Sequence, residues 1–206
     1  MSGSTTMDAG TAVRRGPGRP RNEEMDDLIL TATLELIDAD EDVTVARIVE
    51  RSGVSRAALY RRWPSLNKLI AAGLDVGREV PRVDDADGDL RQSILSAFLM
   101  PELSTDGKYT ERRLRQRLRL TINDPALLRE YWLSHVTRRR EPLRRLMRRG
   151  VDTGILRADT DIEAALDLIA GVVYYQFLVR GDELSDPATR ARCQAALETV
   201  WRAIAA

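Results

Sequence analysis

Five arginines gather in the 23 residues from Val43 to Ser65, where a single acidic residue accompanies them. They are Arg47, Arg51, Arg56, Arg61 and Arg62, and the acid is Glu50. Guanidinium groups at this density suit phosphate oxygens, because duplex DNA carries one negative charge per ~1.7 Å of its axis. The whole chain is neutral, with 32 Lys+Arg and 32 Asp+Glu. The charge is therefore local, which excludes a protein that coats nucleic acid indiscriminately and favours one small basic surface.

The residues around these arginines predict two short helices joined by a tight turn. Thr44 is the expected N-cap of the first helix, and Ile48 lies on its apolar face. Gly53 stands where a helix ends in a left-handed residue, Ser55 can cap the next helix, and Pro64 ends it. A hairpin of this kind can place its second helix in the major groove. The motif alone leaves a second interpretation open, an internal pair of core helices with a solvated basic face.

The segments on either side of the hairpin predict three parts. Residues 1–21 have almost nothing to bury, so they predict a disordered basic arm. Residues 22–66 form the head, whose first helix is capped by Asn22 and reaches about Asp38. Residues 67–206 form a helical body, and a fourth helix from Ser65 to Val80 leads into it.

The body is expected to be helical throughout. After a polar connector that lacks the ligands of a calcium loop, apolar residues recur at helical spacing in five segments. These segments are residues 89–103, 109–123, 125–149, 160–180 and 187–205. Pro142 predicts a kink or break in the third segment, and Thr160 with Glu163 predicts a capping box for the fourth. The fold class is all-α with about nine helices.

The segment from Ile162 to Val179 is apolar on two faces. Leu166, Ile169, Val173 and Phe177 lie on one face, and Leu168, Val172, Tyr175 and Val179 lie on another. A helix that is apolar all round must be covered all round, so a second subunit is expected on one face. The predicted homodimer interface consists of Leu168, Val172, Val179, Leu197 and Trp201.

The stretch TVARIVERSGVSRAALYRRWPS, followed by LNKLIAAGL, resembles the head of the TetR-like (TetR/AcrR) transcriptional regulators. Residues that fit the family pattern are Thr44, Ile48, Gly53, Val54, Ser55, Leu59, Tyr60, Trp63 and Ser65. The match covers about residues 22–75, and the remainder agrees in helix count and length. The resemblance implies a dimeric DNA-binding regulator, most simply a repressor. A small-molecule effector bound in the body would release it from a pseudo-palindromic operator.

The resemblance also assigns DNA contacts to particular residues. Thr44, Tyr60 and Arg62 would contact phosphate, and Arg56 would read guanine through its O6 and N7 acceptors. The full DNA-contacting set is Thr44, Arg47, Ser55, Arg56, Ala57, Ala58, Tyr60, Arg61 and Arg62, with Arg14, Arg15, Arg19 and Arg21 of the arm. Gly18-Arg19-Pro20 resembles an AT-hook that lies in the minor groove, and a plain charged tail is the alternative.

Candidate effector-binding residues are few and weakly indicated. Aromatic residues of the body fit a pocket and a core equally well. The predicted ligand-lining set is Phe98, Trp132, His135 and Tyr175. The basic run VTRRREPLRRLMRRG predicts an inward stripe of Leu143, Leu146 and Met147 with its arginines directed to solvent.

Other classes of function find little support in the residues. One histidine and one cysteine, far apart in sequence, exclude a zinc site or a Ser-His-Asp triad, so no metal, cofactor or enzyme activity is expected. A protein-binding helical scaffold without DNA function is the remaining alternative. The single cysteine, the lack of a secretory signal, and no apolar run near the ~20 residues of a membrane helix predict a cytoplasmic protein.

Overall fold

A computed structural model describes residues 21–78, 80, 89–98 and 109–206, with backbone alone at residues 21–22 and 95–98. The described residues form helices throughout, apart from one isolated β-bridge between Leu156 and Ala205. The helices are α1 (Arg21–Asp38), α2 (Val45–Ser52), α3 (Arg56–Arg62), α4 (Leu66–Asp75), α5 (Leu90–Phe98), α6 (Glu111–Asn123), α7 (Pro125–Tyr131), the π-helical η2 (Trp132–Val136), α8 (Thr137–Asp152), α9 (Ile162–Tyr174), the π-helical η3 (Tyr175–Arg180) and α10 (Pro187–Ile204). Because α7, η2 and α8 run on without a break, as do α9 and η3, these make nine continuous helices and confirm the predicted all-α fold.

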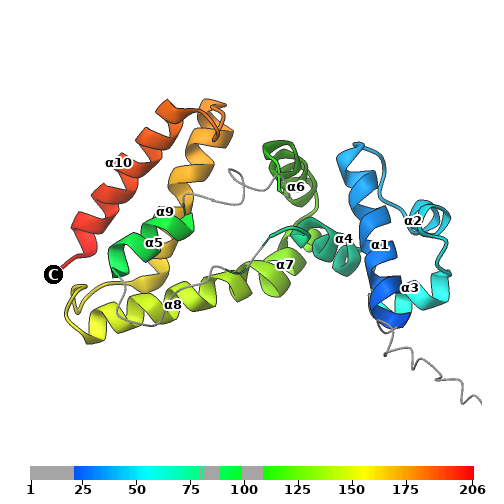
Figure 1. Cartoon of the computed structure of the whole chain (residues 1–206), viewed down its shortest axis with the longest axis horizontal. Helices are drawn as coiled ribbons and strands as arrows, with labels where there is room; N and C mark the ends of the chain where they lie inside the picture. Colours follow the sequence, from blue (N-terminus) through cyan, green and yellow to red (C-terminus); the bar gives the residue numbers. More distant parts are fainter. Residues whose placement is uncertain (1–20, 79, 81–88, 99–108) are drawn as a thin grey trace, which may run out of the picture.

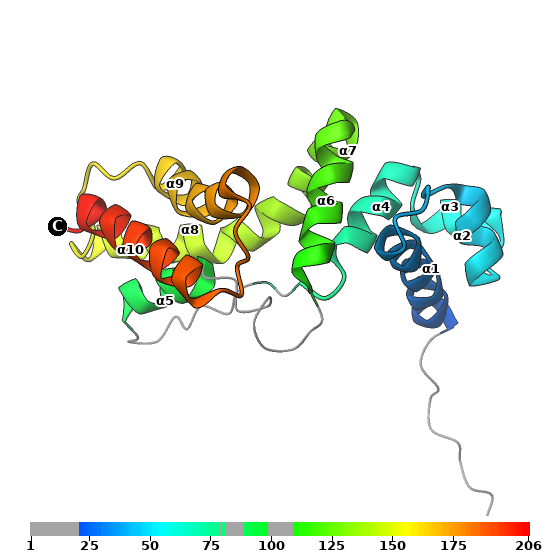
Figure 2. The same cartoon turned by 90° about the horizontal axis from the view of Figure 1, so that it is seen from above.

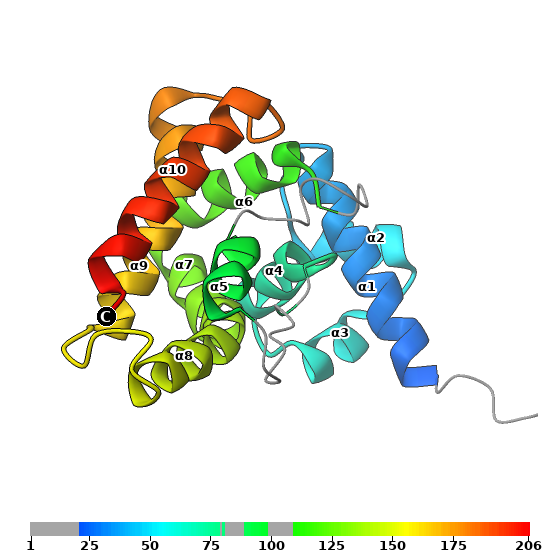
Figure 3. The same cartoon turned by 60° about the vertical axis from the view of Figure 1, so that its left-hand side comes forward.

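The helices are arranged in an elongated body with a small head at one end (Figure 1). Helices α1, α2 and α3 form the head, and α5, α8, α9 and α10 form the far end, where the C-terminus lies. Helices α4, α6 and α7 lie between the two, as the view from above also shows (Figure 2). In a third view, α3 lies beside the lower half of α1, away from α9 and α10 (Figure 3).

The turn between α2 and α3 forms as the sequence predicts. The Thr44 hydroxyl accepts the backbone N–H of Arg47 at 3.3 Å, and the Ser55 hydroxyl accepts that of Ala58 at 3.3 Å. Gly53 ends α2 with φ 68°, a left-handed conformation that costs a residue with a Cβ about 1 kcal/mol or more. These local interactions hold the two short helices at a defined angle.

Three helix ends differ from their predicted positions. Helix α1 begins at Arg21, so Asn22 lies inside the helix and does not cap it. Helix α4 ends at Asp75, five residues before the predicted Val80. Helix α9 is capped by Asp161, whose carboxylate accepts the N–H of Ala164 at 3.0 Å.

The predicted break at Pro142 is wrong, because α8 continues through it to Asp152. Proline inside a helix costs about 3 kcal/mol through the missing hydrogen bond and the ring clash. The residues that follow it, Leu143, Leu146 and Met147, are buried in the body core. Burial of such side chains contributes about 1.5–3 kcal/mol each, which outweighs the cost of the proline.

Helix α4 belongs to two hydrophobic cores at once. Its Leu69 packs in the head with Ile48 and Leu59, whereas its Leu74 packs in a junction cluster with Leu127 of α7. Helix α4 packs tightly on α1 at Gly73, where a Cβ would lie 3.0 Å from Cγ2 of the buried Thr33. The head therefore cannot shift without moving α4 against the body.

The continuous helix of α9 and η3 has the two faces that the sequence predicts. Leu166, Ile169, Val173 and Phe177 are buried, whereas Leu168, Tyr175, Leu178 and Val179 are exposed. The 19 residues from Ile162 to Arg180 are, by length and composition, apolar enough to cross a membrane. This corrects the expectation that no apolar run approaches that length. A third of the apolar stretch is buried inside the protein.

Candidate functional site

Helix α3 presents a basic face to solvent. Ser55, Arg56, Ala57, Tyr60 and Arg61 are all exposed on it. Neither Arg56 nor Arg61 has an ion-pair partner among the residues that the structure describes. Their guanidinium groups are therefore free to meet an anion from outside.

The inward face of α3 includes one residue that was expected to contact DNA. Ala58 is only 5% exposed and lies in the head core beside Leu59. The helical period turns both residues toward α1, so the predicted contact between Ala58 and a base is wrong.

Two other arginines of the hairpin are engaged within the head. Arg62 forms an ion pair with Asp26 of α1 and donates from Nη1 to the backbone oxygen of Ala58 at 3.1 Å. Arg62 thus ties α3 to α1, and its contact with phosphate stays a prediction. Arg47 is exposed and pairs with Glu41 at 3.0 Å. Thr44 is exposed at the first turn of α2.

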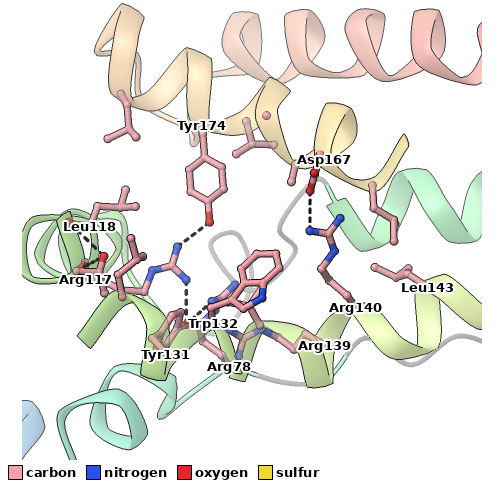
Figure 4. Close-up of a pocket in the computed structure, with 18 residues that line it drawn as sticks. Arg78, Arg117, Leu118, Tyr131, Trp132, Arg139, Arg140, Leu143, Asp167 and Tyr174 are labelled. Carbon is pink, nitrogen blue, oxygen red and sulfur yellow. Dashed lines mark hydrogen bonds and ion pairs between the residues drawn. The ribbon is translucent and has the colours of Figure 1, made fainter. Parts of the chain in front are cut away.

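A cavity of about 500 Å³ lies in the body between α6, the α7–η2–α8 helix and the α9–η3 helix (Figure 4). Most of its wall is apolar, and both π-helical segments contribute to it, as is common for such segments at functional sites. Trp132 and Val136 come from η2, and Leu178 comes from η3. The charged residues of the wall are Arg78, Arg117, Arg139, Arg140 and Asp167.

Three of the arginines converge on one tyrosine hydroxyl. The Tyr131 oxygen lies 2.7 Å from Nη1 of Arg78, 3.1 Å from Nη1 of Arg117 and 2.8 Å from Nη2 of Arg139. Arg117 also donates from Nη2 to the hydroxyl of Tyr174 at 3.2 Å, as the dashed lines show (Figure 4). Tyr131 thereby joins α6, α8 and the segment that follows α4 at one point of the cavity wall.

Arg117 carries its charge in the interior of the protein. Its side chain is 2% exposed, and the rings of Tyr131 and Tyr109 lie 5.4 and 5.9 Å from its guanidinium carbon. Burial lowers the pKa of Arg117, but the oxygens of Tyr174, Tyr109 and Tyr131 outweigh burial and raise it. The pKa of Tyr174 moves in the opposite sense: burial raises it, but the charges of Arg117, Arg78 and Arg139, with the Arg117 hydrogen bond, together lower it. Arg117 is a permanent buried cation.

Asp75, at the end of α4, holds the other charges of this region. Its carboxylate forms a buried ion pair with Arg139, accepts from Nη2 of Arg138 at 2.7 Å, and lies 2.9 Å from Nδ1 of His135. Burial lowers the pKa of Arg139 to about 10, so it stays protonated at neutral pH. On the opposite side of the cavity, Arg140 pairs with Asp167 at 2.7 Å (Figure 4).

Comparison with known proteins decides the family. Residues 29–72 match the family model described as "Bacterial regulatory proteins, tetR family", and residues 80–200 match "Tetracyclin repressor-like, C-terminal domain". The chain belongs to the TetR family. It is therefore a helix-turn-helix transcriptional regulator, which confirms the resemblance that its sequence shows.

Relatives of the same family agree over most of the chain. It is 30% identical over 176 residues to the uncharacterized HTH-type transcriptional regulator YdeS of Bacillus subtilis (strain 168), covering 84% of this chain and 88% of YdeS. The TetR regulator TylP of Streptomyces fradiae is similar in structure, with a TM-score of 0.58, 25% identity, and 90% and 89% of the two chains covered. The TetR family regulator SCO0332 has a TM-score of 0.64 at 22% identity, with 89% of this chain and 100% of SCO0332 covered.

The predicted ligand-lining residues of this TetR-family chain have mixed outcomes. Trp132 lines the cavity. His135 does not, because it turns toward Asp75, and Tyr175 lies outside the cavity on the exposed face of η3 beside Leu168. The side chain of Phe98 lies outside the described residues.

The sequence interpretation missed the cavity arginines. Arg139 and Arg140 are buried, which corrects the expectation that the basic run faces solvent. A signal was present in the spacing: Arg117 lies three residues after the buried Leu114 and four before the buried Thr121. Helical residues three or four apart share a face, so Arg117 stands in the inward row of α6.

The predicted dimer-interface residues differ in their exposure to solvent. Leu168 and Val179 are 61% and 67% exposed, and Val172 and Trp201 are half-buried against the body core. Leu197 is buried inside that core, so its place in an interface is wrong. Of the arm residues, Arg14, Arg15 and Arg19 lie outside the described part of the chain. Arg21 is the first residue of α1.

Proposed function

We propose that this regulator is a homodimeric repressor that a small-molecule effector releases from a pseudo-palindromic operator. The observation that carries the DNA-binding part is the exposed face of α3, where Arg56 and Arg61 have guanidinium groups without a described partner. Groups of this kind match base-edge acceptors and phosphates in the major groove.

The DNA contacts follow from the positions on the head. Arg56, at the first turn of α3, reads guanine, and Arg61 is exposed in the last turn of the same helix. Thr44 and Tyr60 contact phosphates, which fix the register without reading sequence. The arginines of the arm add minor-groove or phosphate contacts beside the head.

The dimer forms through the exposed apolar face of α9 and η3. Leu168, Tyr175, Leu178 and Val179 give this face contiguous apolar area, which a second copy of the chain covers by two-fold symmetry. The other face of the same helix packs against α8 and α10. A helix that crosses a membrane alone would have no need of such packing. We therefore place the protein in the cytoplasm as a dimer whose two heads reach major grooves ~34–36 Å apart.

Effector binding is coupled to DNA binding through α4. The cavity wall contributes Arg139, which is paired with Asp75 at the end of α4, and α4 packs closely on α1 at Gly73. A ligand that favours a different position of α4 thus favours a different spacing of the heads. Near-complete release requires about 5.5 kcal/mol of differential affinity, and DNA must weaken ligand binding equally.

The test is enrichment of bound sequences from a random duplex library by the full chain. A two-fold symmetric motif is expected, with affinity that falls steeply as salt rises. Arg56→Ala with Arg61→Ala should abolish enrichment, whereas Arg129→Ala, an exposed arginine of α7, should leave it unchanged. Failure to enrich any motif, or enrichment of a motif without symmetry, contradicts the proposal.

A further inference from the structure

We propose that the cavity selects an amphipathic organic anion, most simply a carboxylic acid with an apolar body, whose charged group seats against Arg117 and Arg78. This inference rests on the proposed function in that it assigns a chemical class to the effector of the same cavity. It stands on charge balance, on unused hydrogen-bond donors and on the polarity of the cavity wall.

The charges around Tyr131 do not balance. The guanidinium groups of Arg78, Arg117, Arg138 and Arg139 each contact Tyr131 or Asp75, and Asp75 is the one carboxylate that any of them contacts among the described residues. Arg138 and Arg139 already occupy both oxygens of Asp75. Arg78 and Arg117 contact tyrosine hydroxyls and no carboxylate among the described residues. A buried cation without an anion is costly, so a ligand anion would relieve an existing penalty.

The hydrogen-bond donors at this point also exceed the acceptors. A phenol oxygen has two lone pairs, yet three guanidinium groups direct donors at Tyr131. Nε of Arg78 and the hydroxyl of Tyr109 are buried without a hydrogen-bond partner in the described part of the chain. The two lie close together, because the Arg78 guanidinium stands 5.0 Å above the Tyr109 ring. A carboxylate offers about four lone-pair sites, which is what this excess of donors requires.

The remainder of the wall is apolar and requires a ligand with an apolar body. Its apolar residues are Leu118, Leu128, Val136, Leu143, Leu166, Val173 and Leu178. Leu128 and Trp132 are about half exposed, so they stand at the opening of the cavity. A volume of about 500 Å³ lies in the range of small-molecule sites. An inorganic anion would satisfy the arginines and leave these walls uncovered, whereas a neutral apolar molecule would cover the walls and leave the arginines unpaired.

The ion pair between Arg140 and Asp167, on the other side of the wall, leaves room for only one anionic group in the cavity. Arg140 is paired with Asp167 and donates to the backbone oxygen of Glu163 at 3.3 Å. Its guanidinium carbon lies 5.3 Å from the Trp132 ring. This side of the cavity is therefore neutral and aromatic. The ligand's anionic group belongs at the Arg117 side and its apolar body toward Trp132.

The test compares two fluorescent probes that differ by one anionic group. 8-Anilinonaphthalene-1-sulfonate carries a sulfonate, and N-phenyl-1-naphthylamine has the same rings without it. Titration of the full chain should show the sulfonate probe binding at least tenfold more tightly than the neutral probe, the effect of about one charge-assisted hydrogen bond. Inorganic phosphate alone should not displace either probe at millimolar concentration, because it covers none of the apolar wall.

Variants locate the binding to this cavity. Arg117→Gln and, separately, Arg78→Gln should weaken the sulfonate probe about tenfold and change the neutral probe less than twofold. Arg145→Gln is the matched control, because Arg145 is exposed on α8 and its ion pair with Glu141 is long at 4.0 Å. Circular dichroism verifies folding, and if Arg117→Gln does not fold, Arg78→Gln decides the question.

Equal affinity of the two probes for the native chain overturns the anion proposal, as does unchanged sulfonate affinity in folded variants. The duplex motif is measured on the same samples. Absence of duplex binding overturns the proposed function while the probe ratio still decides the ligand class. Duplex binding with no preference for the charged probe overturns the anion proposal alone.

Discussion

Arg139 on helix α8 and Asp75 at the end of helix α4 form an ion pair in which each side chain is only 8% exposed to solvent. The two residues are 64 positions apart in the chain. Arg139 lines the cavity, and Asp75 ends the helix that packs on the head. This pair therefore connects the cavity wall to the helix that packs on the head.

Removing the Asp75 charge should destabilise the protein strongly. Asp75→Asn leaves Arg139 buried without its anion, and the loss of one member of a buried pair costs about 3–5 kcal/mol. Urea denaturation followed by circular dichroism measures the free energy of unfolding. Asp159→Asn, whose pair with Arg157 is exposed, should leave it unchanged. Adding Arg139→Met to Asp75→Asn should restore part of the loss, and no restoration would show that the pair is not the cause.

His135 should make stability fall under mild acid. Burial, followed by the charges of Arg138 and Arg78, lowers the pKa of His135 below 6.5, although the nearby Glu130 raises it. The Asp75 carboxylate, 2.9 Å away, does not reverse this shift, because two arginines already neutralise it.

The direction of this pH dependence follows from the number of protons that the folded and the unfolded chain bind at His135. The unfolded chain takes up a proton at His135 before the folded one does, so its contribution is complete above about pH 6.5 and is lost as pH falls through the folded pKa. His135 by itself can add no more than about 1.4 kcal/mol per pH unit to the slope of the free energy of unfolding. His135→Gln should flatten this slope, since no other histidine is present. An unchanged slope would contradict the assignment.

Arg56 and Tyr60 should have separable effects on DNA binding. Arg56→Ala removes a base contact, so it should cost about 1–3 kcal/mol at the preferred base and relax the preference there. Tyr60→Phe removes a phosphate contact and should weaken all duplexes alike. Fluorescence anisotropy with the selected motif and its single-base variants measures both. Identical profiles for the two variants would show that the division into reading and positioning is wrong.

Leu168 and Val179 should be required for assembly and not for folding. Leu168→Glu or Val179→Glu places a charge on the exposed apolar face and should convert the dimer to monomers in sedimentation velocity. Ile122→Glu changes an equally exposed apolar residue on α6 and should leave the dimer intact. Leu197→Ala should instead lower the stability of each subunit by about 2–5 kcal/mol. Dimers that persist in both glutamate variants would contradict the interface.

Much of the structure of the head can be predicted from the sequence, because the helix caps and the turn depend on neighbouring residues. Thr44, Gly53 and Ser55 each act within three or four positions, and all three perform the predicted backbone roles. The exceptions were Ala58 and Arg62. Their inward direction depends on how α3 rests on α1, which brings Arg62 against Asp26, 36 positions away. The periodicity of a seven-residue helix is too short to distinguish its groove face from its core face.

The residues alone determined the helical class, the helix-turn-helix, the family and the two-faced helix of α9 and η3, because caps, periodicity and a short motif are properties of neighbouring positions. The tertiary structure alone decided which partners the buried arginines meet. Arg117 meets Tyr131 and Tyr174, which lie 14 and 57 positions further along the chain. An arginine is inward only when distant partners satisfy its donors, and no local pattern contains those partners.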